Sequence, residues 1–227
     1  MKCVILASGF GTRMYPLTLG TPKPLLTYKD HPLLSHIVNR LPQEIEVYVT
    51  VNRRFEDDFR TWQQHCSRMV KLIIEDVWDE SQSLGALGSL ENAVKTEFIN
   101  EDLFVIAGDN YFEFSIEAFL DAYNGINPLI AVYDIGVISE NSQYGIVLVE
   151  NQKVIDFQEK PTQPKSSLVA TGCWVLPSRI FPLLSKYYSR RKKDNLGHFV
   201  EYLVDEDEIN AWLFTELWLD IQSEFIK

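Results

Sequence analysis

The first 29 residues, MKCVILASGFGTRMYPLTLGTPKPLLTYK (1–29), contain the pattern that decides the fold of this chain. The apolar run at residues 2–7, which has no polar alternation, predicts a fully buried strand of a parallel sheet. It leads into a glycine loop, Ser8-Gly9-Phe10-Gly11-Thr12, followed at once by Arg13 and, ten residues further on, by the proline-flanked Lys23. Glycines let the main chain approach an anion closely, and the N–H groups of the loop can point at it. A buried strand, a permissive backbone and fixed cations together predict a polyphosphate site.

The overall composition is that of an ordinary globular protein rather than a nucleic-acid or membrane protein. With 227 residues, 46% of them hydrophobic and 23% charged, the chain predicts a single domain over residues 1–227. Its formal net charge is −11, and none of its 32 acidic residues lies in the first 29 positions. Because such a molecule repels anions, we expect neither nucleic acid nor an anionic membrane as a partner.

Location and redox state follow from similar observations. No run approaches the roughly 18 apolar residues of a membrane helix, and the N-terminus does not read as a secretory signal, so we expect a cytoplasmic protein. Cys3, Cys66 and Cys173 are odd in number and lack C-x-x-C spacing. We therefore expect reduced thiols, with Cys3 and Cys173 buried in strand-like segments. The sequence leaves open whether the chain forms a homo-oligomer.

The remaining elements alternate in the first half and change character in the second. Apolar runs and helical periodicity predict strands at 2–7, 44–51, 69–74, 103–107 and 128–134, with helices at 32–41, 53–66, 84–94 and 115–123. This alternation predicts βαβ units and a mostly parallel sheet covered on both faces. Beyond residue 140 we expect an antiparallel hairpin (144–149 and 153–158), strands at 169–176 and 209–214, and helices at 177–188 and 195–204.

The glycine loop does not match the commonest anion-binding motifs. The P-loop pattern G-x-x-x-x-G-K-[ST] is absent, because no Lys-Ser or Lys-Thr follows at that spacing. In a dinucleotide motif, Met14 would stand where the third glycine brings the helix close to the sheet. Leu6 occupies the first glycine position of a G-x-S-x-G nucleophile elbow. By itself the loop could therefore still be a glycine-rich turn that binds nothing.

Read together, three segments resemble a longer signature. They are L-x-x-G-x-G-T-R ending at Arg13, then Pro16-Leu17-Thr18, then Pro22-Lys23-Pro24-Leu25. This combination resembles the sugar-nucleotidyltransferases, the nucleotide-sugar pyrophosphorylases such as the glucose-1-phosphate thymidylyltransferases. The resemblance implies a three-layer α/β/α Rossmann-like sandwich with a mixed, mostly parallel sheet. It also implies that the loop wraps a nucleoside triphosphate and that Arg13 and Lys23 are the catalytic cations. The nucleotide-binding positions would be Ala7, Ser8, Gly9, Gly11, Thr12, Arg13 and Gly85, with Ser8 where the family most often has Gly or Ala.

Two acidic positions are candidates for a metal site. Asp109 directly follows the predicted strand 103–107, which places it at the carboxyl edge of the sheet, although an aspartate there can also be a simple helix cap. Gly108-Asp109-Asn110 resembles the metal motif of the family, and Trp218-Leu219-Asp220-Ile221 resembles the segment that carries its second aspartate. The resemblance thus implies Mg²⁺ held by Asp109 and Asp220, a hard cation on carboxylate oxygens. Gln222-Ser223 stand where the family has Gly-Thr.

The acceptor side has motifs of its own. Glu159-Lys160-Pro161 resembles the E-K-P element that holds a sugar phosphate, Tyr144-Gly145 resembles a Y-G element, and Thr171-Gly172 lies where the family has N-x-G, with Ala170 in place of the asparagine. In Gln82 to Gly88, a segment similar to the family's nucleobase-side L-G-T-A-G, Ala86 replaces the threonine. The resemblance implies that Gly145, Glu159, Lys160, Thr171 and Gly172 bind the sugar phosphate.

These implications combine into one expected reaction. A sugar-1-phosphate oxygen attacks the α-phosphorus of a nucleoside triphosphate, and pyrophosphate leaves, with residues 1–135 mainly on the nucleotide side and 136–227 mainly on the acceptor side. Such chemistry needs positioning and neutralisation of negative charge but no protein nucleophile. A cytidylyltransferase for a non-sugar phosphate such as phosphocholine, and an inactive nucleotide or sugar-phosphate sensor, remain as alternatives. The sequence identifies neither the base nor the sugar.

Overall fold

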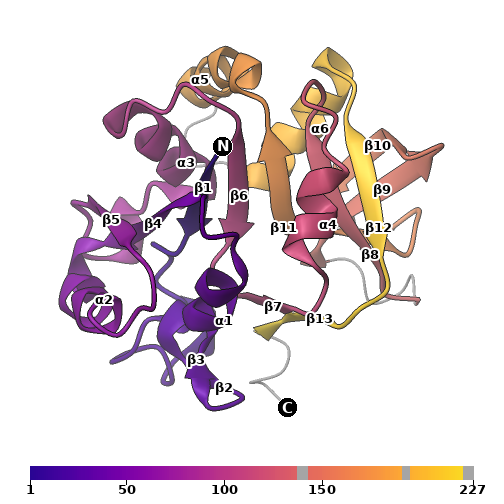
Figure 1. Cartoon of the computed structure of the whole chain (residues 1–227). Coiled ribbons are helices and arrows are strands. Elements are labelled where there is room, and N and C mark those ends of the chain that lie inside the picture. Colours follow the sequence, from indigo (N-terminus) through magenta and orange to yellow (C-terminus); the bar gives the residue numbers. More distant parts are fainter. Residues whose placement is uncertain (137–142, 191–194, 222–227) are drawn as a thin grey trace.

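The computed structural model of the chain describes residues 1–136, 143–190 and 195–221. A nine-stranded sheet in the order β5-β4-β1-β6-β11-β8-β12-β10-β9 forms its centre (Figure 1). In chain order these strands are β1 Lys2–Leu6, β4 Glu46–Asn52, β5 Val70–Glu75, β6 Leu103–Ala107, β8 Leu129–Asp134, β9 Gly145–Glu150, β10 Lys153–Glu159, β11 Leu168–Leu176 and β12 Asn210–Phe214. The strand and helix segments predicted from sequence are all present, with their ends shifted by a few residues.

The sheet is mixed, as expected. Strands β5, β4, β1 and β6 pair in parallel, and so do β8 and β12. Strand β11 is antiparallel to both β6 and β8, and β10 is antiparallel to both β12 and β9. All strands of this sheet except β10 and β11 therefore point the same way, which confirms the mostly parallel arrangement.

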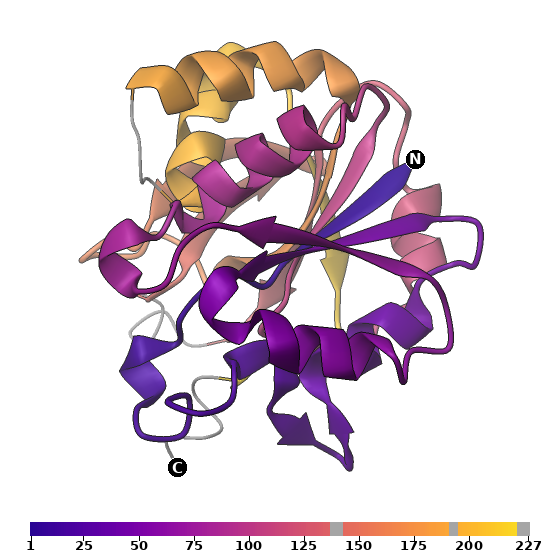
Figure 2. The same ribbon diagram turned by 90° about the vertical axis from the view of Figure 1, so that its left-hand side faces the viewer.

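Helices cover both faces of the sheet and complete the three layers (Figure 2). One face packs against α1 (Leu33–Arg40), α2 (Glu56–Gln63) and α4 (Ile116–Asp121). The other packs against α3 (Gly85–Thr96), α5 (Phe181–Arg190) and α6 (Leu196–Glu206). Within β1, Cys3 and Ile5 belong to the first core and Val4 to the second, and all three are fully buried. Because both faces of β1 are covered, its sequence is continuously apolar rather than alternating.

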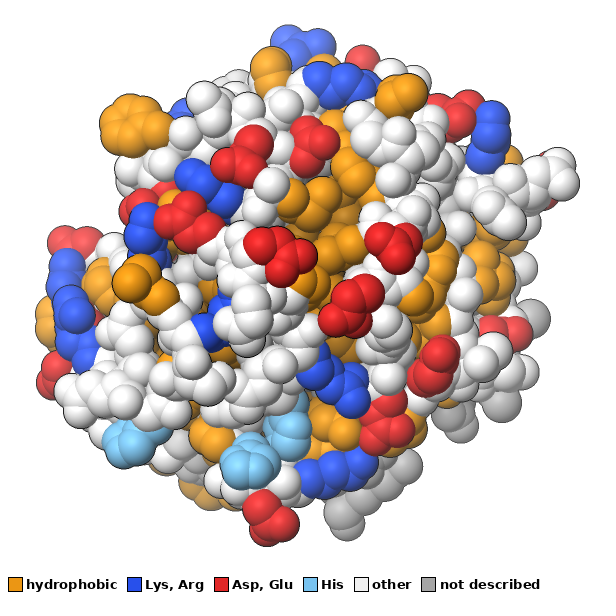
Figure 3. Space-filling model, viewed as in Figure 1, with side chains coloured by type: hydrophobic (Ala, Val, Ile, Leu, Met, Phe, Trp, Pro, Cys, Tyr) orange, Lys and Arg blue, Asp and Glu red, His pale blue; other side chains and the backbone are white. Residues whose placement is uncertain are grey.

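The cysteines, the surface charge and the lengths of the helices can each be compared with what the sequence predicts. Cys3 and Cys173 are free and fully buried, as expected, and Cys66 is also free. On the face seen in Figure 3, acidic side chains surround an exposed apolar patch, and Lys and Arg are scattered among them. Among the described residues, no helix is long and apolar enough to cross a membrane.

The elements that sequence reasoning missed are short. A two-stranded antiparallel ribbon joins β7 (Asn110–Phe112) to β13 (Trp218–Asp220), and a second one joins β2 (Thr27–Tyr28) to β3 (His31–Pro32). Segments of two or three residues carry no readable periodicity, and the partner of β7 lies more than a hundred positions away in the sequence. The β7–β13 ribbon nevertheless positions the candidate site.

Candidate active site

A cavity of about 360 Å³ opens where β1 ends in the glycine loop. Every residue predicted for the nucleotide side lines it, as do Lys23 and Asp109; the predicted set is Ala7, Ser8, Gly9, Gly11, Thr12, Arg13 and Gly85. The volume lies within the range of small-molecule pockets, about 300–1,000 Å³. The N-terminal segment and the start of α3, far apart in sequence, thus form one concave surface.

The glycine loop has a conformation that only some residues tolerate. Gly11 adopts φ +65°, and a Cβ placed on it would lie 3.1 Å from the Thr18 methyl carbon. The Thr18 hydroxyl donates a hydrogen bond of 2.7 Å to the Gly11 carbonyl. Glycine at position 11 therefore permits both the left-handed backbone and the close contact. The chain then enters a 3-10 turn, Thr12–Met14, which carries the exposed Arg13 at the rim of the cavity.

Buried polar side chains hold the loop from below. The Asn52 amide donates to the Ser8 carbonyl (2.9 Å), and the Thr50 hydroxyl accepts from the Ala7 N–H (3.2 Å). The Ser8 hydroxyl contacts the Ser89 hydroxyl at 2.9 Å in the interior, so a serine is accommodated at this position of the loop. Sequence reasoning did not identify Asn52 or Thr50. The available signal was that both polar residues lie at the carboxyl end of β4, after its apolar residues 47–49.

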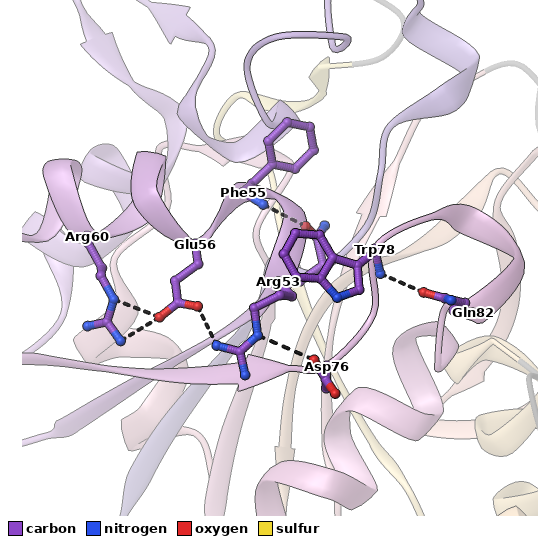
Figure 4. A network of polar contacts seen from close by, with 8 residues as sticks. Arg53, Phe55, Glu56, Arg60, Asp76, Trp78 and Gln82 are labelled. Atoms are coloured by element: carbon purple, nitrogen blue, oxygen red, sulfur yellow. Dashed lines mark hydrogen bonds and ion pairs between the residues drawn. The ribbon is translucent and has the colours of Figure 1, made fainter.

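A surface network fixes the loop that follows β5 (Figure 4). Glu56, at the start of α2, pairs with Arg60 and with Arg53, and Arg53 reaches Asp76 at 3.4 Å. The Trp78 N–H donates to the Gln82 side chain at 2.7 Å. Exposed ion pairs contribute little stability individually. Together these contacts order the segment that leads to Glu80 and Ser83, both of which line the cavity.

The predicted catalytic residue Lys23 lies next to both predicted metal-binding aspartates, Asp109 and Asp220. Its ammonium group lies 2.7 Å from Asp109 Oδ2 and 3.6 Å from Asp220 Oδ1. Lys23 is only 8% exposed and belongs to the 3-10 turn Lys23–Leu25, which follows Pro22 and contains Pro24. The flanking prolines restrict the backbone on both sides of the lysine, which reduces the entropy lost in fixing it.

The β7–β13 ribbon explains how the two aspartates come together. Asp220 is paired with Asn110, and the Ile221 N–H reaches the Asp109 carbonyl at 3.4 Å. The Trp218 indole N–H donates to Asn110 Oδ1 at 2.7 Å, and the Asn110 amide in turn donates to Asp109 Oδ1 at 2.9 Å. Asn110 thus orients Asp109, a role that sequence reasoning missed although the residue stands next to the aspartate.

The donor set suits a hard divalent cation. Asp109 and Asp220 are within reach of one positive group, as the shared contact to Lys23 demonstrates. Among the described residues, no cluster of three or more His, Cys, Asp or Glu side chains could hold a metal by itself. A pair of carboxylates fits Mg²⁺, which commonly takes its remaining ligands from substrate phosphates and water. Gln222-Ser223, where the family pattern has Gly-Thr, lie outside the described residues.

The predicted acceptor residues gather beside this cavity without lining it. Glu159 ends β10 opposite Gly145, and its side chain, 8% exposed, lies 3.6 Å from the Lys160 ammonium. Burial raises the pKa of the Glu159 carboxyl, and nearby Lys160 opposes that shift. Gly172 approaches Ala107, whereas the Thr171 hydroxyl donates to the Ala131 carbonyl at 3.0 Å and points into the core. The structure therefore brings Gly145, Glu159 and Lys160 together and turns the Thr171 side chain away.

The chain is similar in sequence to known nucleotidyl transferases. A family model described as nucleotidyl transferase matches residues 2–223. The bifunctional protein GlmU of Methanocaldococcus jannaschii is 26% identical over 226 residues, covering 97% of this chain and 51% of that protein. The mannose-1-phosphate guanyltransferase of Saccharomyces cerevisiae is 26% identical, with coverage of 97% of this chain and 61% of its own length.

Among solved structures, a Bacillus anthracis protein assigned as a glucose-1-phosphate thymidylyltransferase superposes with a TM-score of 0.86 at 23% identity. The match covers 98% of this chain and 90% of that one. A UDP-glucose pyrophosphorylase superposes with a TM-score of 0.79 at 20% identity, over 99% of this chain and 94% of that one. These structures support the fold. The chain spans about half the length (51%) of the Methanocaldococcus jannaschii GlmU.

Proposed function

The chain belongs to the nucleotidyl transferase family, and from that premise we propose that it transfers a nucleoside monophosphate from a nucleoside triphosphate to a sugar-1-phosphate, giving a nucleotide sugar and pyrophosphate. The observation that carries this proposal is the cluster of Lys23, Asp109 and Asp220 beside the glycine-loop cavity. It brings a buried cation and a pair of carboxylates together beside the concave surface of the glycine loop.

The residues of this chain have separable tasks in such a reaction. The Gly9–Thr12 backbone would hold the triphosphate, since these residues line the cavity, Gly9 and Gly11 let the main chain approach an anion closely, and the Phe10 side chain is buried. Arg13 at the rim and Lys23 inside would bind phosphate oxygens and stabilise the negative charge that grows as the α-phosphorus is attacked. Holding both substrates in line supplies the rest of the rate enhancement. No side chain needs to act as a nucleophile.

We assign Asp109 and Asp220 as the residues that would hold Mg²⁺. When bound, the metal would neutralise phosphate charge and help to orient the triphosphate. Asn110 supports this role because its amide holds one Asp109 oxygen and leaves the other toward Lys23.

On the acceptor side we propose that Gly145, Glu159, Lys160 and Gly172 bind the sugar-1-phosphate, with the Glu159 carboxylate accepting from sugar hydroxyls. Thr171 would then contribute through its backbone. In this scheme residues 1–135 mainly bind the nucleotide and 136–227 mainly bind the acceptor, except that Asp220 returns to the metal site. We further propose that the protein works in the cytoplasm, in keeping with its three free thiols.

The test is an assay of pyrophosphate release. The protein is incubated with each of five nucleoside triphosphates and a panel of sugar-1-phosphates, with and without Mg²⁺. We expect turnover with at least one sugar-1-phosphate, strict dependence on Mg²⁺, and loss of turnover in Asp109→Asn. Arg13→Ala should slow the reaction by on the order of 10²-fold or more, the usual effect of losing a group that stabilises developing charge.

Other outcomes would assign the chain differently. Pyrophosphate release with phosphocholine alone would make it a cytidylyltransferase for a non-sugar phosphate. Tight triphosphate binding with no turnover on any acceptor would make it a sensor. A wild-type rate in Arg13→Ala would refute the catalytic assignment of that residue.

A further inference from the structure

The first turn of α6 closes over the acceptor carboxylate. Leu196, the first residue of the helix, lines the cavity that holds the glycine loop. Its neighbour Asn195 donates a hydrogen bond of 2.9 Å from its amide to Glu159 Oε1. None of the sequence motifs described above includes this turn, yet it touches both the cavity and Glu159.

Asn195 performs two tasks at once. Its side-chain oxygen accepts from the His198 N–H at 3.0 Å, which caps α6, while its amide group donates to Glu159. An amide NH₂ carries two hydrogens, and a carboxylate can accept several hydrogen bonds. After their mutual contact, the pair can still offer one donor and an acceptor side by side. Two neighbouring hydroxyls of a sugar ring, each able to donate and accept, match that arrangement.

Gly197 makes room for this pair. A Cβ placed on Gly197 would come within 1.7 Å of Glu159 Oε2 and 2.4 Å of its Cδ. Because real Cβ atoms never approach so closely, any other residue at 197 would displace the whole Glu159 carboxylate. Glycine in a helix is otherwise unfavourable, since it costs backbone entropy. The Glu159 side chain uses the space that this glycine leaves.

We propose that the first turn of α6 is the specificity element of the acceptor site, with Asn195 and Glu159 together binding two neighbouring hydroxyls of the sugar. This inference rests on the proposed function and deepens it. It assigns a substrate that carries two neighbouring hydroxyls and no positive charge at that position. The remaining N–H of Asn195 donates a hydrogen bond, which suits a hydroxyl, whereas an ammonium group would need only hydrogen-bond acceptors around it. The assignment concerns the sugar ring rather than the phosphate, which Lys160 would bind.

The test separates binding of the acceptor from folding of the helix. Asp is as good a helix N-cap as Asn, so Asn195→Asp should keep the cap of α6. It removes the donor to Glu159 and places a second carboxylate beside it. With the sugar-1-phosphate that the wild type uses fastest, we expect KM for the acceptor to rise about tenfold or more, the effect of losing one hydrogen bond to a charged group. The KM for the nucleoside triphosphate should not change.

Gly197→Ala provides the second variant. Alanine favours the helix, which offsets part of the cost of displacing Glu159 from Asn195, so the melting temperature should change by only a few degrees while KM for the acceptor increases. A variant that stays folded with nearly the wild-type melting temperature and an unchanged KM for the nucleoside triphosphate, yet binds the acceptor less well, cannot be explained by a purely structural role of position 197. Ser115→Asp is the matched control, because Ser115 caps α4 through the Ala118 N–H and the swap should leave both KM values unchanged.

Deoxy analogues of the same sugar-1-phosphate identify the contacted hydroxyls. The effect of Asn195→Asp should disappear with the analogue that lacks the hydroxyl bound by Asn195 and persist with the others. If the wild type is active and both variants keep the wild-type KM for the acceptor, the inference is overturned while the proposed function stands. If the wild type uses no sugar-1-phosphate at all, the proposed function fails and this inference fails with it.

Discussion

Replacing Lys23 by methionine should lower the free energy of unfolding and at the same time increase the stabilisation that Mg²⁺ gives. The ammonium group lies 2.7 Å from Asp109 and 3.6 Å from Asp220, and the lysine is 8% exposed. Losing one partner of a fully buried pair costs about 3–5 kcal/mol, whereas an exposed pair contributes about 0–1 kcal/mol. Because the Asp109 side chain is 40% exposed, water compensates part of the loss. We therefore expect a destabilisation of about 2 kcal/mol in metal-free solution.

The assay is thermal unfolding in EDTA and in MgCl₂. For a chain of this length, about 2 kcal/mol corresponds to a melting temperature lower by about 4–8 °C. Without the ammonium group the two carboxylates should bind Mg²⁺ about tenfold more tightly. At saturating metal the variant then regains about 1.4 kcal/mol more than the wild type does.

Lys71→Met serves as the control, because Lys71 pairs with Glu46 at the surface, away from the cavity. We expect it to cost at most about 1 kcal/mol and to leave the Mg²⁺ response unchanged. If Lys23→Met melted within a degree of the wild type and gained no more from Mg²⁺, the reasoning would be refuted, since Lys23 would then not be coupled to the two carboxylates.

Three further substitutions probe the same region. Asn110→Ala leaves the buried Trp218 indole without its acceptor, so unfolding free energy should fall by about 1–3 kcal/mol and turnover should fall with it, measured by denaturant titration and pyrophosphate release. A Cβ placed on Gly172, at φ +73°, would lie 2.8 Å from the Ala107 Cβ, whereas a Cβ on Gly125, at φ +75°, would have nothing within 4 Å. Gly172→Ala should therefore destabilise the protein more than Gly125→Ala, for which about 1 kcal/mol is expected. Equal melting temperatures of the two variants would contradict the packing argument. Burial raises the pKa of the Glu159 carboxyl above 4.5, so its contribution to stability is present at low pH and lost as pH rises through the folded-state pKa. Glu159→Gln should remove that loss of stability. If urea titrations between pH 4 and 7 give unfolding free energies that change in parallel for the wild type and the variant, this expectation is disproved.

Much of the fold was predictable because its elements are long and strongly patterned. Residues 2–7 are continuously apolar since β1 is covered on both faces, and the alternation of strands and helices up to residue 134 predicted the parallel half of the sheet. The glycine loop, Lys23 and Asp109 could be identified as candidates because each belongs to a motif whose spacing is read within a few residues. All of them meet at one cavity.

Tertiary structure decided the rest, because the contacts join residues that are distant in sequence and lie in short segments. Asp220 reaches Lys23 only through the β7–β13 ribbon, whose two strands are three residues each and have no periodic signal. Asn52 beneath the loop and Asn195 above Glu159 read in sequence as ordinary polar residues at the ends of a strand and a helix. Even Thr171, identified by its motif, turns its hydroxyl into the core. The sequence alone determined which chemical groups are available, and the folded chain determined which of them face one another, because hydrogen bonds and ion pairs depend on distances that no local pattern encodes.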